Sequence, residues 1–175
     1  KHPLINSAVN KLVQIVMSTK TFYDGAEKDI SFVEGWFDGL ADTGGEDDWY
    51  TIKTKLFQYQ AIYGWCPVEL IPGKAKNNLM DLSIINPEKF DYAKRLNNIL
   101  ALDEHQNPKG YTVGYPYGIG YTSTGSSQTN QKFKIPEGVM ILGNQLFLPP
   151  DRVANFKMYT AGDGFYPIGL IEPAY

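Results

Sequence analysis

The chain has 175 residues, enough for one domain that buries roughly 70% of the surface its unfolded form exposes. Apolar residues make up 43% of it and aromatic residues 14%, which argues against disorder over most of the length. Sixteen basic and 19 acidic residues give a formal charge of −3, and the lysines are scattered from Lys1 to Lys157, so a fragment that binds nucleic acid by itself is disfavoured.

Cysteine usage and hydropathy narrow the class further. The single cysteine, Cys66, excludes an internal disulfide and any multi-cysteine metal site. No apolar run approaches the ~20 residues that span a bilayer, and the first residues do not form a signal peptide. We therefore expect a cytoplasmic protein without a membrane partner, and because the chain begins with Lys1 we expect a fragment of something longer.

Two helices are predicted in the first 40 residues. Apolar residues at spacings of three and four predict the first over residues 4–19, with Pro3 near its first turn. Ile30, Val33, Phe37 and Leu40 repeat at the same spacing and predict a second helix. Asp29 is its expected N-cap.

A third helix is predicted over residues 49–63. Asp47 or Asp48 is placed to cap its start, and an acidic start suits the positive end of the helix dipole. Gly64 follows it and is expected to adopt the left-handed conformation that ends many helices.

From Pro67 onward the pattern becomes that of strands and turns. Residues 98–115 predict a hairpin whose turn contains Asn107-Pro108 and Gly110, and residues 121–131 predict a mobile loop. Further strands are predicted at residues 68–71, 79–85, 132–135, 139–142, 145–148 and 153–159.

This order of elements predicts the fold class. Helices come first and strands later without strict alternation, which favours an α+β fold with N-terminal helices packed on a mostly antiparallel, hairpin-rich β-sheet. We expect a single domain over residues 1–175, with a helical part at about 1–65 and a β-rich part at about 66–160.

The residues that nucleophilic catalysis would need are sparse. The chain has two histidines; His2 is terminal and His105 lies in the predicted hairpin turn, where a solvated surface residue is the simpler interpretation. Cys66 lies between Trp65 and Pro67, where an inert buried thiol is favoured. We therefore expect no catalytic residues and no enzymatic activity.

Several carboxylates and glycines are candidates for a metal or phosphate site. The acidic run before residue 49 is explained by helix capping, and Asp103-Glu104 lies at a turn. Gly118 and Gly120 lack the third glycine of a dinucleotide site, and no Walker pattern occurs. We therefore expect no metal and no cofactor.

The tyrosines are harder to place in a core. Tyr115 and Tyr117 belong to the glycine-spaced run GYTVGYPYGIGY, residues 110–121. Tyrosine offers a large contact area at low entropy cost and is enriched at interfaces. The sequence therefore indicates a subunit or domain contact there.

Three segments, in this order, resemble bacteriophage portal proteins, the ring-forming head-to-tail connectors of tailed viruses. FQYQAIYGWCPVELI (57–71) resembles the family's helix that ends in a glycine and passes into a strand with an acidic residue. LMDLSIINPEKF (79–90) and ALDEHQNPKGYTVGY (101–115) resemble its strand, Asn/Asp-Pro break and hairpin. LPPDRVANFKMYTAGDGFYPIG (148–169) resembles its Pro-Asp step before a Val-x-x-Phe strand and a small-residue turn.

The resemblance implies a structural subunit from the outer, wing-like part of a portal at the capsid vertex. Such subunits form a ring, usually of twelve copies, through which DNA passes during packaging and ejection, in the virion and in the host cytoplasm during assembly. A separate terminase supplies ATPase activity, and the terminase, capsid and neck proteins bind regions mostly absent here. The resemblance also implies that the long stem helix would begin near Tyr175.

A closed ring needs two different matching faces on each subunit. Tyr115, Tyr117, Arg152 and Asp163 are the candidate interface residues. An ion pair of Arg152 with Asp151, worth under ~1 kcal/mol, is the plainer alternative for that arginine.

Two other classes of function remain open at this point. A carbohydrate- or peptide-binding module predicts an open groove lined by Tyr115, Tyr117 and Trp65. A metal-dependent hydrolase predicts that several carboxylates converge, drawn from Asp47, Asp103, Glu104 and Asp163.

Overall fold

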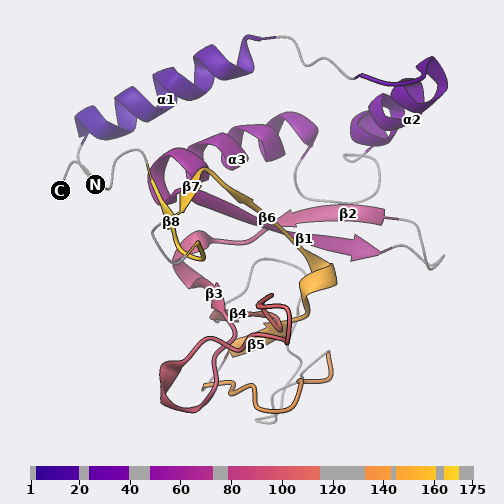
Figure 1. Cartoon of the computed structure of the whole chain (residues 1–175). Coiled ribbons are helices and arrows are strands. Elements are labelled where there is room, and N and C mark those ends of the chain that lie inside the picture. Colours follow the sequence, from indigo (N-terminus) through magenta and orange to yellow (C-terminus); the bar gives the residue numbers. More distant parts are fainter. Residues whose placement is uncertain are drawn as a thin grey trace, which may run out of the picture. The chain divides into compact units, whose positions relative to one another are not determined.

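The structure, a computed structural model, is α+β, as the sequence predicts, with three helices ahead of antiparallel sheets (Figure 1). It describes residues 3–19, 24–39, 48–72, 79–114, 133–142, 145–160 and 164–169. The chain divides into two compact units, Lys1–Ile84 with Asn155–Tyr175, and Ile85–Ala154. The predicted change from helices to strands near residue 65 agrees with the start of the first strand, Trp65. The two units, however, divide between residues 84 and 85 and between residues 154 and 155. The single domain expected over the whole chain stays a prediction.

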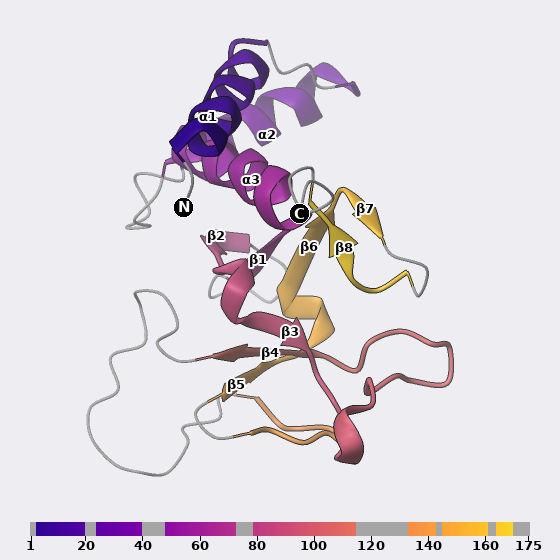
Figure 2. The same ribbon diagram turned by 90° about the vertical axis from the view of Figure 1, so that its left-hand side faces the viewer.

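The first unit begins with three helices, α1 (Pro3–Met17), α2 (Glu27–Asp38) and α3 (Trp49–Tyr63). Their bounds agree with the predicted helices to within a few residues. Helix α1 runs beside α3 (Figure 2), and Val9 and Val13 of α1 are buried against Ala61 of α3. Since these apolar side chains leave water together, their burial supplies the main attraction between the two helices.

Helix α2 is held differently, because none of its described residues is buried. Its Phe37 stacks on Trp49 at the start of α3, with 3.9 Å between ring centroids. The predicted cap is wrong: Ala26 precedes the helix, and Asp29 lies inside its first turn beside Glu27. There the two carboxylates complement the positive end of the helix dipole instead of capping the helix.

Both ends of α3 are as predicted. The Asp48 carboxylate accepts a hydrogen bond from the Thr51 amide at 2.7 Å, and hydrogen bonding from Thr51 lowers the pKa of Asp48. Gly64 has a φ of 77°, the left-handed conformation that closes the helix.

Strands of the first unit lie directly against α3. Strand β1 (Trp65–Pro72) pairs antiparallel with β2 (Leu79–Ile84), and β6 (Val153–Lys157) completes the order β2-β1-β6. A short pair, β7 (Tyr159–Thr160) with β8 (Pro167–Ile168), follows. Helix α3 packs on β1 and β2, and five consecutive residues of β1, Trp65 to Glu69, are buried beneath it or within the sheet.

Main chains approach closely where α3 meets β8. A Cβ atom built on Gly64 would lie 2.5 Å from the Ile168 carbonyl carbon, and one built on Gly169 would overlap the Ile62 carbonyl. The Met158 amide also donates to the Gly64 carbonyl at 2.8 Å. The end of α3 is therefore joined by backbone contacts to a segment roughly a hundred residues later in the chain.

The second unit is built on an antiparallel sheet in the order β3-β4-β5. Its strands are β3 (Phe90–Tyr92), β4 (Tyr111–Gly114) and β5 (Gln145–Leu148). Ala93, Ala101 and Phe147 form its buried core, with partly buried side chains from residues 133–141 packed around them.

Several predicted strands of this unit are wrong. Residues 133–142 contain no strand; they contribute apolar side chains to the core and one isolated bridge, Met140 to Lys94. The arm predicted to begin at residue 98 makes isolated bridges instead of a ladder. Strand β3 was not predicted, since three residues give too short a pattern. The predicted loop at 121–131 lies outside the described residues.

Replacing Gly64 by Ala tests the close approach. We expect Gly64→Ala to lower the free energy of unfolding by more than about 3 kcal/mol, because the left-handed backbone and the overlap with Ile168 both oppose a Cβ atom. Gly164→Ala is the matched control, with a φ of 73° and no atom within 4 Å, and should cost about 1 kcal/mol. Urea denaturation measures both; equal losses would show that the contact with Ile168 contributes nothing.

Candidate functional site

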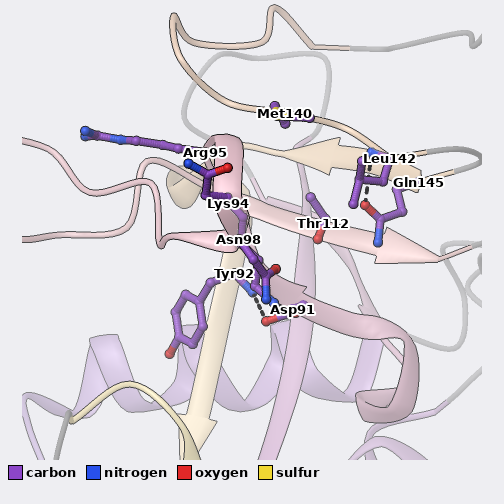
Figure 3. Close-up of a pocket in the computed structure, with 10 residues that line it drawn as sticks. Asp91, Tyr92, Lys94, Arg95, Asn98, Thr112, Met140, Leu142 and Gln145 are labelled. Atoms are coloured by element: carbon purple, nitrogen blue, oxygen red, sulfur yellow. Dashed lines mark hydrogen bonds and ion pairs between the residues drawn. The ribbon is translucent and has the colours of Figure 1, made fainter.

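A pocket of about 290 Å³ opens on one side of the second unit (Figure 3). Its walls come from β3, the turn that follows it, β4, β5 and the segment ending at residue 142. Met140 and Leu142 are its apolar residues. Its hydrogen-bonding and charged side chains are those of Asp91, Tyr92, Lys94, Arg95, Asn97, Asn98, Thr112 and Gln145.

The turn after β3 places two asparagines at this pocket. The Arg95 amide donates to the Ile99 carbonyl at 2.6 Å and closes the turn. Within it Asn97 and Asn98 have φ angles of 65° and 63°, a left-handed pair that asparagine tolerates better than other residues with a side chain. The Ala101 amide then donates to the Ala93 carbonyl at 2.9 Å, so the chain returns to β3 within eight residues.

Thr112 contributes the most buried polar side chain of the pocket. It lies opposite Asp91 of β3 and Phe147 of β5 in the register, so the three side chains share one face of the sheet. It is 4% exposed, and in Figure 3 it lies between Asn98 and Gln145. The sheet face therefore changes from the apolar core at Phe147 to a polar pocket floor.

One ion pair lies in the pocket, and a second cation, Arg95, lies at its edge. Lys94 Nζ lies 2.6 Å from Asp91 Oδ2, and both side chains are partly exposed, so the pair contributes under about 1 kcal/mol. The other oxygen of Asp91 accepts the Tyr92 amide at 2.7 Å. Arg95 donates to the Leu102 carbonyl at 2.7 Å and, like the Tyr92 ring, points away from the other labelled residues (Figure 3).

This lining is rich in groups that form hydrogen bonds. Among the described lining residues Thr112 and Tyr92 carry hydroxyl groups, and the Tyr92 ring points away from the others (Figure 3). These lining residues include no histidine or cysteine. The amides and the hydroxyl both donate and accept, and the Asp91–Lys94 pair offers one group of each kind. The arrangement is suited to holding a polar ligand.

The predicted interface residues are not brought together at this pocket. Arg152 lies in the short turn Pro150–Arg152, half-buried, with its guanidinium 5.3 Å from the centre of the Phe133 ring. That distance allows a cation–π contact within the second unit. Tyr115, Tyr117 and Asp163 lie outside the described residues.

Carboxylates do not converge in the part of the chain that the structure describes. Within it, no three histidine, cysteine or acidic side chains are close enough to hold a metal ion. Asp103 instead accepts the His105 and Asn107 amides at 2.9 and 2.8 Å, and hydrogen bonding, first from Asn107, lowers its pKa. Glu104 lies 3.5 Å from His105 Nε2 on the surface. Asp47 and Asp163 lie outside the described residues.

Trp65 and Cys66, two residues considered above as candidates for function, are buried in the first unit. Trp65 is 7% exposed and its ring lies 6.4 Å from that of Tyr166, so it does not line the open groove that the alternative of a binding module requires. Cys66 is fully buried, and burial raises the pKa of its thiol to about 12. This agrees with the interpretation of an inert thiol.

Sequence reasoning missed the pocket itself. The available signal was Asn97-Asn98, a polar pair between apolar residues, which indicates a left-handed turn. Its position beside Thr112 and Gln145 depends on strand pairing over long stretches of chain, which no local pattern reveals.

Comparison with protein-family models and with curated proteins gave no match. None of the helices in the described ranges is both long and apolar enough to cross a membrane.

Cys66 gives a direct test of burial in the first unit. We expect its thiol to react with a disulfide reagent more than about a hundredfold more slowly in the native chain than in the unfolded chain at mildly alkaline pH, because burial both blocks access and keeps the thiol protonated. The same chain in denaturant is the control. A fast native reaction would contradict the packing around β1.

Asp103 gives a pH test of the turn at residues 103–107. Its pKa in the folded chain is lowered, so the stabilisation it gives is complete above the ordinary carboxyl pKa and is lost as pH falls through the lowered value. We expect the His105 and Asn107 amide signals in NMR spectra to shift together with that titration. Asp103→Asn keeps an accepting oxygen and should abolish the shift; a shift that persists in this variant must come from another group.

Proposed function

We propose that this chain is the outer, wing-like part of a bacteriophage portal subunit and that it acts structurally, not as an enzyme. The proposal rests on the order of three local structures along the chain. Each lies within one of the portal-like sequence segments, and their succession is the single observation on which we rely.

The first of these structures is the passage from α3 to β1. Gly64 ends the helix in the left-handed conformation, and the strand that follows contains Glu69, which is 1% exposed. A buried acidic residue in a strand requires polar partners to be favourable. By itself this combination is common among helix-to-strand connections, so it supports the resemblance only through its place in the order of the three segments.

The other two structures are short proline-containing turns, each of which leads into a strand. Asn86 caps the short turn Pro87–Lys89 by accepting the Glu88 amide at 3.0 Å, and β3 follows directly. Later, the turn Pro150–Arg152 leads straight into β6, which contains the Val-x-x-Phe pattern. Both lie in the segments where the sequence resembles the proposed family.

In this proposal, copies of the subunit assemble side by side into a closed ring, usually of twelve, at the capsid vertex. Ring closure requires a head-to-tail interface between two different faces. Tyr115, Tyr117, Arg152 and Asp163 remain the proposed interface residues, with terminase, capsid and neck proteins as further partners. DNA would contact the assembled channel, and the separate terminase would hydrolyse ATP in the host cytoplasm before the virion is complete.

Ring formation is the test of this proposal. We expect the chain, expressed together with the coding sequence that continues it, to form rings visible by negative-stain microscopy. Replacing Tyr115 and Tyr117 together by Ser should reduce the ring fraction at least about tenfold, if each buried tyrosine contributes about 1 kcal/mol or more at a subunit contact.

The control is Tyr50→Ser, which removes a tyrosine that is 63% exposed on α3 and should leave assembly unchanged. Circular dichroism checks that each variant is folded. A continued chain that stays monomeric at micromolar concentration, with its native helices intact, would overturn the portal proposal.

A further inference from the structure

We infer that the pocket of the second unit is a binding site for a neutral sugar unit. The inference is independent of the portal proposal, because it concerns a ligand held within one copy of the chain. It rests on the pocket's volume, on the ion pair between Lys94 and its one carboxylate, Asp91, and on the kind of hydrogen-bonding groups that line it.

Charged ligands are disfavoured because the charged side chains of the pocket already interact with other groups of the chain. Lys94 Nζ is 2.6 Å from Asp91 Oδ2, so its charge is matched, and Arg95 is turned toward the Leu102 carbonyl. An anion would have to separate the Lys94–Asp91 pair or lie beside a carboxylate. A metal ion would find that one carboxylate, which already accepts two hydrogen bonds.

A purely apolar ligand is disfavoured by the pocket floor. Thr112 is 4% exposed, and an apolar group against its hydroxyl would leave a buried polar atom without a hydrogen bond. Asn97 and Asn98 would lose water at the same time. The occupant must therefore offer both donors and acceptors.

Addition of a peptide strand at β3 is disfavoured because main-chain groups at this edge already form hydrogen bonds within the chain. The Tyr92 amide donates to Asp91 Oδ1 at 2.7 Å, and the Lys94 carbonyl accepts the Met140 amide at 2.8 Å. Strand addition needs such main-chain groups to be available on an edge. Here they are occupied by the chain's own residues.

A sugar meets the remaining requirements. Each of its hydroxyl groups donates and accepts, as do the asparagine amides and the Thr112 hydroxyl around it. Met140 and Leu142, 37% and 61% exposed, can cover the C–H face of the ring. At about 290 Å³ the pocket lies at the small end of ligand sites, which limits the occupant to one or two rings.

Binding is tested by NMR titration of the full ¹⁵N-labelled chain with glucose, galactose and N-acetylglucosamine. We expect millimolar affinity for at least one of them, with amide shifts at Asp91, Asn98, Thr112 and Gln145. Sodium acetate, inorganic phosphate and a capped neutral tripeptide are the competing probes and should give no such shifts.

Two variants locate the site. Asn98→Gly keeps the left-handed turn and removes the amide, and Thr112→Val keeps the shape and removes the hydroxyl; each should weaken binding about tenfold. Gln106→Gly, at another left-handed residue with a φ of 65° in the turn at 103–107, should bind as the native chain does.

The inference is overturned if no saccharide shifts the pocket amides, if a tripeptide or an anion shifts them and the sugars do not, or if both variants bind unchanged. None of these outcomes affects ring formation, and a continued chain that binds sugar but stays monomeric would overturn the portal proposal alone.

Discussion

The first unit depends on one constraint, the meeting of main chains at Gly64. This residue ends α3 in a left-handed conformation, accepts the Met158 amide and leaves room for the Ile168 carbonyl. Because β1 starts at the next residue, the direction in which the buried strand leaves the helix is fixed at the same point. Residues from the end of the chain are thereby packed on its first half, and this contact needs a residue without a side chain at both Gly64 and Gly169.

In the second unit a glycine also permits close packing, but here an aromatic side chain, and not a main chain, packs against it. A Cβ atom on Gly110 would fall within the Phe147 ring, so that ring packs directly on the backbone just before β4. Phe147 also contacts the buried Ala93 and Ala101, two small residues that let three segments approach one another. The apolar core and the polar pocket floor then occupy one sheet face, since Thr112 and Phe147 are register neighbours. A change in either would be felt by the other.

The parts of this fold that local chemistry determines could be predicted from the sequence. Helix α3 has a strong cap at Asp48 and a glycine at its end, so both bounds were right. The strands predicted within residues 133–142 are wrong, because an apolar run is equally compatible with a strand and with an irregular segment whose side chains fill a core. Asp29 was wrong as a cap because a carboxylate near a helix start is also stable within the first turn. The pocket was missed because its residues come from three separate stretches of the chain, 91–98, 112 and 140–145, which only long-range pairing brings together.

Assembly and sugar binding would place different demands on these units. A ring interface gains from large, rigid aromatic side chains, and the tyrosine-rich run at 110–121 supplies them in the sequence. A sugar site gains from pre-ordered polar groups, and the second unit supplies these through two left-handed asparagines and a nearly buried threonine. Asparagine enters this conformation more readily than other residues with a side chain, so the turn is held at modest cost while it places both amides at the pocket. Gln106 has the same conformation in a turn that does not line the pocket, so the asparagine pair is distinguished by its position beside Thr112 and not by its backbone conformation.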